Sequence, residues 1–138
     1  MEYVRRKSSR IKVSELDYIN ERVKLEYDCF INCIKKIPYK YVFLEELDWE
    51  KGINFITTFI VVEEQHEAVL KILTDKQKKI YWLHYIKSYD QIEIAQELGI
   101  SKQLVFKHMQ LIDGKIYKVL TKHVIEEIRI EEKLESQQ

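Results

Sequence analysis

Sharp turns of the backbone are rare in this chain, because its 138 residues include only three glycines and one proline. β-Sandwiches and β-barrels need many tight turns, and glycine and proline supply most of them. An all-β fold is therefore not expected. The length suits a single domain, at about 100–200 residues per domain. Because 46% of the residues are hydrophobic, the chain can bury a core, and we expect a mainly α-helical fold.

The pattern of apolar and charged residues divides the chain into four parts. Residues 1–13 form a basic arm without apolar periodicity, and residues 14–72 combine an N-terminal helix with a strand-like segment. Residues 73–120 carry the clearest helix signals, and residues 121–138 form a C-terminal helix or tail. In the second part, Ser14 is a predicted N-cap and Pro38 ends the periodic pattern. The helix predicted over residues 14–37 carries an apolar stripe of Leu16, Ile19, Val23, Tyr27, Phe30, Ile34 and Ile37.

Residues 39–62 permit two interpretations. Aromatic and charged or aliphatic residues alternate from Tyr39 to Leu44, and the run Ile53–Val62 is rich in β-branched and aromatic residues. Both segments are typical of short strands, which predicts a β-hairpin around Gly52. A helical turn at residues 48–50 is the alternative. From Glu63 onward the apolar spacing is helical again.

Four local features in residues 73–120 mark the ends of predicted helices. Thr74 with Gln77 matches a capping box, and Asp90 is a good N-cap for a helix over residues 91–98. Gly99 fits the left-handed position that ends a helix, and Ser101 caps the next helix. Two helices joined by a short turn containing glycine predict a helix-turn-helix.

The second helix of this motif has the chemistry of a DNA-reading element. The N-terminus of a helix favours a phosphate, and Ser101 stands there. Lysine can donate to guanine and glutamine can bridge adenine in the major groove. Phe106 could contact a thymine methyl group or pack on the first helix, and Lys115 and Lys118 suit phosphates better than bases. The candidate DNA-binding residues are Ser101, Lys102, Gln103, Phe106, Lys107, Gln110, Lys115 and Lys118.

The distribution of charge agrees with local contact to a polyanion. The whole chain is formally neutral, with 23 basic and 23 acidic residues. Residues 73–120 nevertheless hold eight bases and five acids, and residues 1–12 hold five bases and one acid. Residues 38–72 hold three bases and seven acids, the wrong sign for gripping a DNA strand.

Residues 73–120 resemble region 4 of the sigma-70 family of bacterial RNA polymerase subunits. The resemblance is carried by L-T-D-K-Q at residues 73–77 and E-I-A-Q-E-L-G-I-S at residues 93–101, followed by Val105, Ile112, Lys115 and Ile116. It implies that Lys102, Gln103 and Lys107 read a −35-like promoter element in double-stranded DNA and that core RNA polymerase is a partner. In this chain Ile112 stands where the family usually has alanine, and Gly114 is expected to interrupt the long last helix at a cost of ~1 kcal/mol relative to alanine.

No counterpart of sigma region 2, which melts promoters, is found in the sequence. The plan of the chain is similar to the small sigma-like regulators of conjugative elements and phages, so a partner subunit carrying region 2 is expected, with residues 14–72 as a candidate partner-binding part. Two other functions stay open. One is an autonomous repressor or activator that binds DNA as a homodimer formed through the helix over residues 14–37. The other is a protein-interaction module that acts on a sigma factor.

Several other kinds of site are not expected. The sequence has no Gly-rich phosphate loop, nucleophile elbow or Cys-x-x-Cys motif, so we predict neither an enzyme nor a cofactor. Cys29 and Cys33 are interpreted as reduced, half-buried thiols without a metal. No apolar run reaches the length of about 20 residues that spans a membrane, and no signal peptide is recognisable, which predicts a cytoplasmic protein. Residues 121–138 could extend the last helix, fold back or form a dimer seam.

Overall fold

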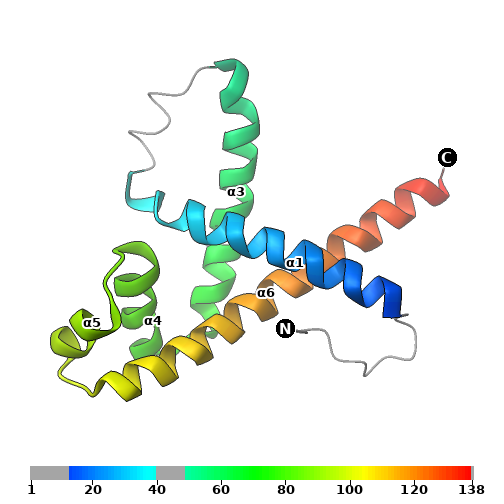
Figure 1. Cartoon of the computed structure of the whole chain (residues 1–138). Coiled ribbons are helices and arrows are strands. Elements are labelled where there is room, and N and C mark those ends of the chain that lie inside the picture. The colour runs from blue at the N-terminus through cyan, green and yellow to red at the C-terminus, as the bar shows by residue number, and fades with distance from the viewer. Residues whose placement is uncertain (1–12, 40–48, 138) are drawn as a thin grey trace.

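The fold is helical throughout the residues that the computed structural model describes, which are 13–39 and 49–137 (Figure 1). The elements in chain order are α1 (Val13–Ile34), the 3-10 turn η1 (Ile37–Tyr39), α3 (Trp49–Ile72), α4 (Asp75–Tyr81), the π-helical turn η2 (Trp82–Ile86), α5 (Gln91–Leu98) and α6 (Lys102–Ser136). The expectation of a mainly α-helical protein is confirmed for these residues.

Helix α6 contacts α1, α3, α4 and α5. Its 35 residues make a rod of roughly 52 Å at ~1.5 Å per residue. Helices α4 and α5 pack on its N-terminal part, α1 crosses its middle and later part, and α3 contacts both α1 and α6 (Figure 1). The core where they meet is one cluster of buried apolar side chains, which includes Val23, Phe30, Ile34, Val69, Ile80, Tyr81, Ile94, Val105, Ile112, Ile116, Leu120 and Val124.

Helix α1 corresponds closely to the helix predicted over residues 14–37. It begins at Val13, one residue before the predicted cap Ser14, and ends at Ile34. The amide of Lys36 then donates to the carbonyl of Cys33 over 3.0 Å, and Pro38 lies in η1. The helix therefore ends before the proline, as the steric restriction on the residue preceding proline requires.

The predicted β-hairpin is wrong wherever the structure describes it. Gly52 and the whole run Ile53–Val62 lie inside α3, and residues 40–44 of the first predicted strand fall outside the described residues. In a strand Ile60 and Val62 would share a face, but Ile60 is 54% exposed and Val62 is 2% exposed. Burial instead follows helical steps of three and four through Phe59, Val62, His66 and Val69.

The local signals of residues 73–101 are confirmed at atomic detail. Thr74 and Gln77 form the predicted capping box of α4, and Asp90 forms a second one with Glu93 at α5. Gly99 has the left-handed backbone with φ of 65°. Ser101 caps α6, with its hydroxyl accepting from the amide of Leu104 over 3.1 Å.

The expected interruption of the last helix at Gly114 is wrong, and of the alternatives left open for residues 121–138 the structure shows an extension of the helix. It runs without a break through Gly114 and continues to Ser136, so residues 121–136 extend it. Arg22 of α1 binds this extension through its Nη2, which lies 2.7 Å from Oε2 of Glu127. Ile130 and Leu134 remain exposed near its end.

Polar contacts link α1 and α4–η2 to the middle of α6. The hydroxyls of Tyr27 and Tyr85 both donate to Oδ1 of Asp113, and the ring of Tyr27 stacks on Tyr117 with centroids 4.3 Å apart. Burial, followed by the charge and hydrogen bond of Asp113, raises the pKa of both tyrosines.

The two cysteines are free, as expected. Among the described helices, none combines the length and apolar character that a bilayer-spanning segment needs.

Candidate nucleic-acid interface

The two helices α5 and α6 are held at a fixed angle by buried apolar residues and by the turn between them. Ile94 of α5 and Val105 of α6 are completely buried in the shared core. The left-handed backbone of Gly99 reverses the chain, and the amide of Ile100 donates to the carbonyl of Ala95 over 3.1 Å. The result is a helix, a three-residue turn and a second helix whose N-terminus projects from the core (Figure 1).

The two N-termini of this unit differ in charge. Helix α5 is capped by the carboxylate of Asp90, and Glu93 reaches back to the same turn. Helix α6 is capped by the neutral hydroxyl of Ser101, and a lysine follows directly at position 102. Since a helix N-terminus carries partial positive charge, only that of α6 is left free of a nearby acidic cap. An anion such as a phosphate would therefore bind at α6 rather than at α5.

A hydrogen bond between the helices fixes the start of α6. Nε2 of Gln91, the first residue of α5, donates to the backbone carbonyl of Lys102 over 2.8 Å. This bond holds the first turn of α6 against α5. Gln91 was not among the residues singled out in the sequence, because its partner is eleven positions away and no local pattern marks the pair.

Most of the candidate residues share one exposed surface. Gln103, Lys107 and Gln110 recur at steps of four and three, which places them on one stripe of α6. Lys102 and Phe106 form the neighbouring stripe, and the side chain of Phe106 is 49% exposed. All five are exposed, as is Ser101. From residue 102 to residue 110 the helix rises about 12 Å, comparable to the ~12 Å width of the major groove.

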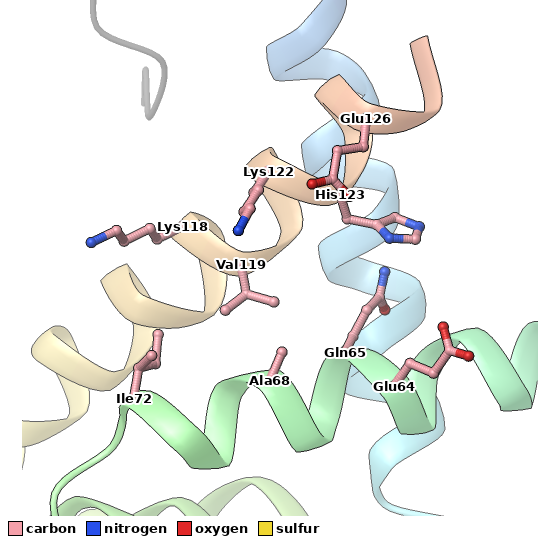
Figure 2. A pocket seen from close by; sticks show the side chains of 9 residues that line it. All are labelled: Glu64, Gln65, Ala68, Ile72, Lys118, Val119, Lys122, His123 and Glu126. Atoms are coloured by element: carbon pink, nitrogen blue, oxygen red, sulfur yellow. The ribbon is translucent and has the colours of Figure 1, made fainter. Parts of the chain in front are cut away.

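The remaining two candidates, Lys115 and Lys118, lie elsewhere. Nζ of Lys115 donates to Oε1 of Gln77 over 2.6 Å, so this half-buried lysine ties α6 to the first turn of α4. Lys118 is exposed but lines a groove between α3 and α6 (Figure 2). It stands about 24 Å along the helix from Lys102. The structure therefore groups the first six candidates and separates these two from them.

The groove between α3 and α6 has a volume of about 390 Å³. Its floor is apolar, and lysines and glutamates stand along its edges (Figure 2). The residues lining it are Glu64, Gln65, Ala68, Ile72, Lys118, Val119, Lys122, His123 and Glu126.

The aromatic residues that follow the cap of α4 belong mainly to the core. Tyr81 is completely buried and Tyr85 nearly so, whereas Trp82 is 41% exposed. A row of exposed rings on which unpaired bases could stack is therefore not formed by these residues. Tyr81 and Tyr85 instead pack in the core.

Comparison with known families agrees with this geometry. Residues 64–112 match the family model described as sigma-70, region 4. The match runs from the second half of α3 through α4, η2 and α5 into the exposed part of α6. No curated protein and no solved structure matches the chain. Residues 64–112 therefore form a sigma-70 region 4-like helix-turn-helix, a DNA-binding regulatory type of domain and not a catalytic one.

Proposed function

We propose that this protein is a sequence-specific DNA-binding transcription regulator that acts at promoters together with RNA polymerase. The observation that carries the proposal is the exposed polar surface at the start of α6, in a segment that matches sigma-70 region 4. Region 4 domains bind both DNA and RNA polymerase. This role assigns the protein to the cytoplasm, where the DNA lies.

In the proposed mechanism the N-terminus of α6 docks a phosphate and the following residues read bases. The hydroxyl of Ser101 accepts from the amide of Leu104, and the amides of Lys102 and Gln103 would donate to a phosphate oxygen. Lys102, Gln103 and Lys107 then reach the base edges of the major groove, where lysine selects guanine and glutamine selects adenine. Gln110 and Phe106 lie at the margin of the same surface. Lys118, and Lys115 if it leaves Gln77, would add phosphate contacts that raise affinity without specificity.

Charge reversal at position 102 tests the reading surface. Because the target is unknown, the probe is the duplex that the wild-type protein enriches from a pool of random sequences. Lys102→Glu should abolish specific binding to this duplex while leaving the helix content unchanged. Lys133→Glu is the matched control, since Lys133 is an exposed lysine near the other end of the same helix. Normal binding by the Lys102→Glu protein would show that the reading surface lies elsewhere.

The polymerase part of the proposal has its own test. Purified core RNA polymerase is passed over the immobilised, folded protein, and retention is the expected result. A subunit that carries region 2 would then be sought among the proteins retained together with polymerase. Failure to retain polymerase, with DNA binding intact, would contradict the polymerase part and leave a regulator that works without it.

One observation favours a second candidate function, an autonomous dimeric repressor or activator. Its dimer surface cannot be the apolar stripe of α1, which was expected from the sequence, because Leu16, Val23 and Phe30 are buried in the core of the chain itself. Ile130 and Leu134 are exposed at 58% and 59% near the projecting end of α6, and residues four apart lie on one face of a helix. Pairing of two such ends would supply the two-fold symmetry that palindromic half-sites require. Sedimentation of the wild-type protein and of Leu134→Lys distinguishes the candidates. A dimer that becomes a monomer in the variant supports the second function, and a monomeric wild type excludes it.

A further inference from the structure

Three potential metal ligands meet where α1 and α6 cross, far from the DNA-reading surface. Glu26 of α1 and His123 and Glu127 of α6 each offer one ligand atom, and these atoms all lie within 4.8 Å of one another. All three side chains are half-buried. No local sequence pattern marks this group, because Glu26 is distant from the other two residues in sequence, and no metal site was expected.

The two ligands on α6 have the spacing that suits chelation by a helix. His123 and Glu127 are four residues apart, so they stand one above the other on the same face. Nε2 of His123 lies 2.8 Å from Oε1 of Glu127. A metal ion bound between them through Nε2 would replace this hydrogen bond, and the neutral imidazole would carry its proton on Nδ1.

Neighbouring side chains hold each carboxylate by one oxygen. Arg22 Nη2 donates to Oε2 of Glu127 over 2.7 Å, and Gln65 Nε2 donates to Oε2 of Glu26 over 2.9 Å. Neither bond occupies the Oε1 atom of its carboxylate. Outer partners of this kind orient the ligands of metal sites in proteins.

The local charge also favours a cation. Nη1 of Arg22 lies 3.4 Å from Oε2 of Glu131, so this one guanidinium contacts two carboxylates of α6. Glu26 is held by the neutral amide of Gln65, so the carboxylates of Glu26 and Glu127 are not each matched by a cation in these contacts. A divalent ion would add positive charge between these two half-buried carboxylates.

Solvent reaches the group from two sides. The groove of Figure 2 is lined by Gln65 and His123. A second hollow, of about 360 Å³, is lined by Glu26, Gln65 and Glu127. A hydrated ion can therefore approach through either opening, and water can complete its coordination.

We propose that Glu26, His123 and Glu127 form a binding site for a divalent transition-metal ion of the zinc type. One imidazole nitrogen and two carboxylate oxygens match the ligands that zinc takes in proteins, and three protein ligands leave the fourth position to water. The ion joins α1 to α6. Since an ion that binds only the folded chain stabilises it, zinc raises the midpoint of thermal unfolding.

Zinc affinity is measured by competition with a chromophoric chelator, and thermal unfolding is followed with and without zinc. The wild-type protein is expected to bind one Zn²⁺ per chain and to melt several degrees higher. His123→Gln and Glu26→Gln should each weaken zinc binding by about tenfold or more, since changes even in outer partners cost roughly 10–100-fold. Glutamine keeps a hydrogen-bonding group at both positions, so these variants are expected to fold.

Two controls separate this site from others. Glu135→Gln removes an exposed carboxylate that lies about 12 Å along α6 from Glu127 and is not in the group, so zinc affinity should stay within about twofold of wild type. Cys29→Ser tests the thiol pair, because Sγ of Cys29 lies 3.9 Å from Sγ of Cys33 and thiolates bind zinc. Zinc binding that survives His123→Gln, or that is lost in Cys29→Ser, overturns the proposal. So does the absence of zinc binding by the wild-type protein.

Discussion

Among single residues, Gly99 and Gly114 offer a matched pair because each has open space around it but the two backbones differ. A Cβ at either position would meet nothing within 4 Å, so crowding plays no part. Gly99 has φ of 65°, in the left-handed region, whereas Gly114 lies inside α6. The effect of adding a methyl group at each position should therefore reflect backbone conformation alone.

We predict opposite effects of alanine at these two glycines. Gly99→Ala should destabilise the fold by about 1–2 kcal/mol, the cost of a left-handed residue with a Cβ. Gly114→Ala should stabilise it by ~1 kcal/mol, because alanine is the better helix former. Urea unfolding monitored by helix content measures both changes. Equal changes in the two variants would contradict the backbone explanation.

For single residues, the sequence predicted those site residues whose role depends on partners close by in the sequence. Asp90, Gly99 and Ser101 were found because capping depends on partners within three or four positions. Lys115 was assigned to phosphates, but it donates to Gln77, which lies 38 positions away. The contact of Gln91 with Lys102 was missed for a similar reason. A sequence pattern read locally does not encode which distant side chains will meet.

Between elements, the contact of α3 with α4 contains a buried histidine. Nδ1 of His66 lies 2.6 Å from the hydroxyl of Tyr81, and both side chains are buried. Burial lowers the pKa of His66, and the nearby charges of Glu67 and Glu63 oppose this only in part. The folded protein therefore keeps this imidazole neutral at pH values at which the unfolded chain would protonate it.

This pKa shift predicts that stability falls in mildly acidic solution. Because the folded pKa lies below the unfolded value of about 6.5, the unfolded chain binds the proton first. Stability is full above pH 6.5 and is lost as the pH falls toward the folded pKa, by up to about 1.4 kcal/mol per pH unit. Urea unfolding at pH 7.5 and 5.5 measures the loss. His66→Gln should show a smaller difference between the two pH values, and an equal difference would show that other groups cause it.

The element that sequence analysis misjudged was α3. Its run Ile53–Val62 is rich in isoleucine, threonine, phenylalanine and valine, which are typical of strands. The strand preferences of these residue types are weak, however, and tertiary packing stabilises a helix here. In the structure Phe59, Val62 and Val69 form a buried stripe that extends the helical pattern already visible after Glu63. The length of α6 was likewise open in the sequence, since its C-terminal half is largely polar and is held by a contact with α1.

For the whole molecule, the continuity of α6 joins the DNA-reading unit to the α1 end. Helices α4 and α5 contact its first part and α1 its later part, while α3 contacts both α1 and α6. The buried apolar side chains form one cluster from Leu16 to Val124. A chain arranged in this way should unfold as one cooperative unit.

We therefore predict that a destabilising substitution in the part of α6 that contacts α1 also lowers the stability of α5. Val124 is completely buried in the later part of α6, and Val124→Ala should cost about 2–3 kcal/mol through lost burial and a cavity. Hydrogen exchange at the slowest amides of α5 should accelerate by the equivalent factor, although no residue of α5 is altered. Ile130→Ala, at an exposed position of the same helix, should change stability by less than ~0.5 kcal/mol. Unchanged hydrogen exchange in α5 of the Val124→Ala protein would instead mean that the sigma region 4-like unit folds independently. The long helix would then connect the two parts without coupling their stabilities.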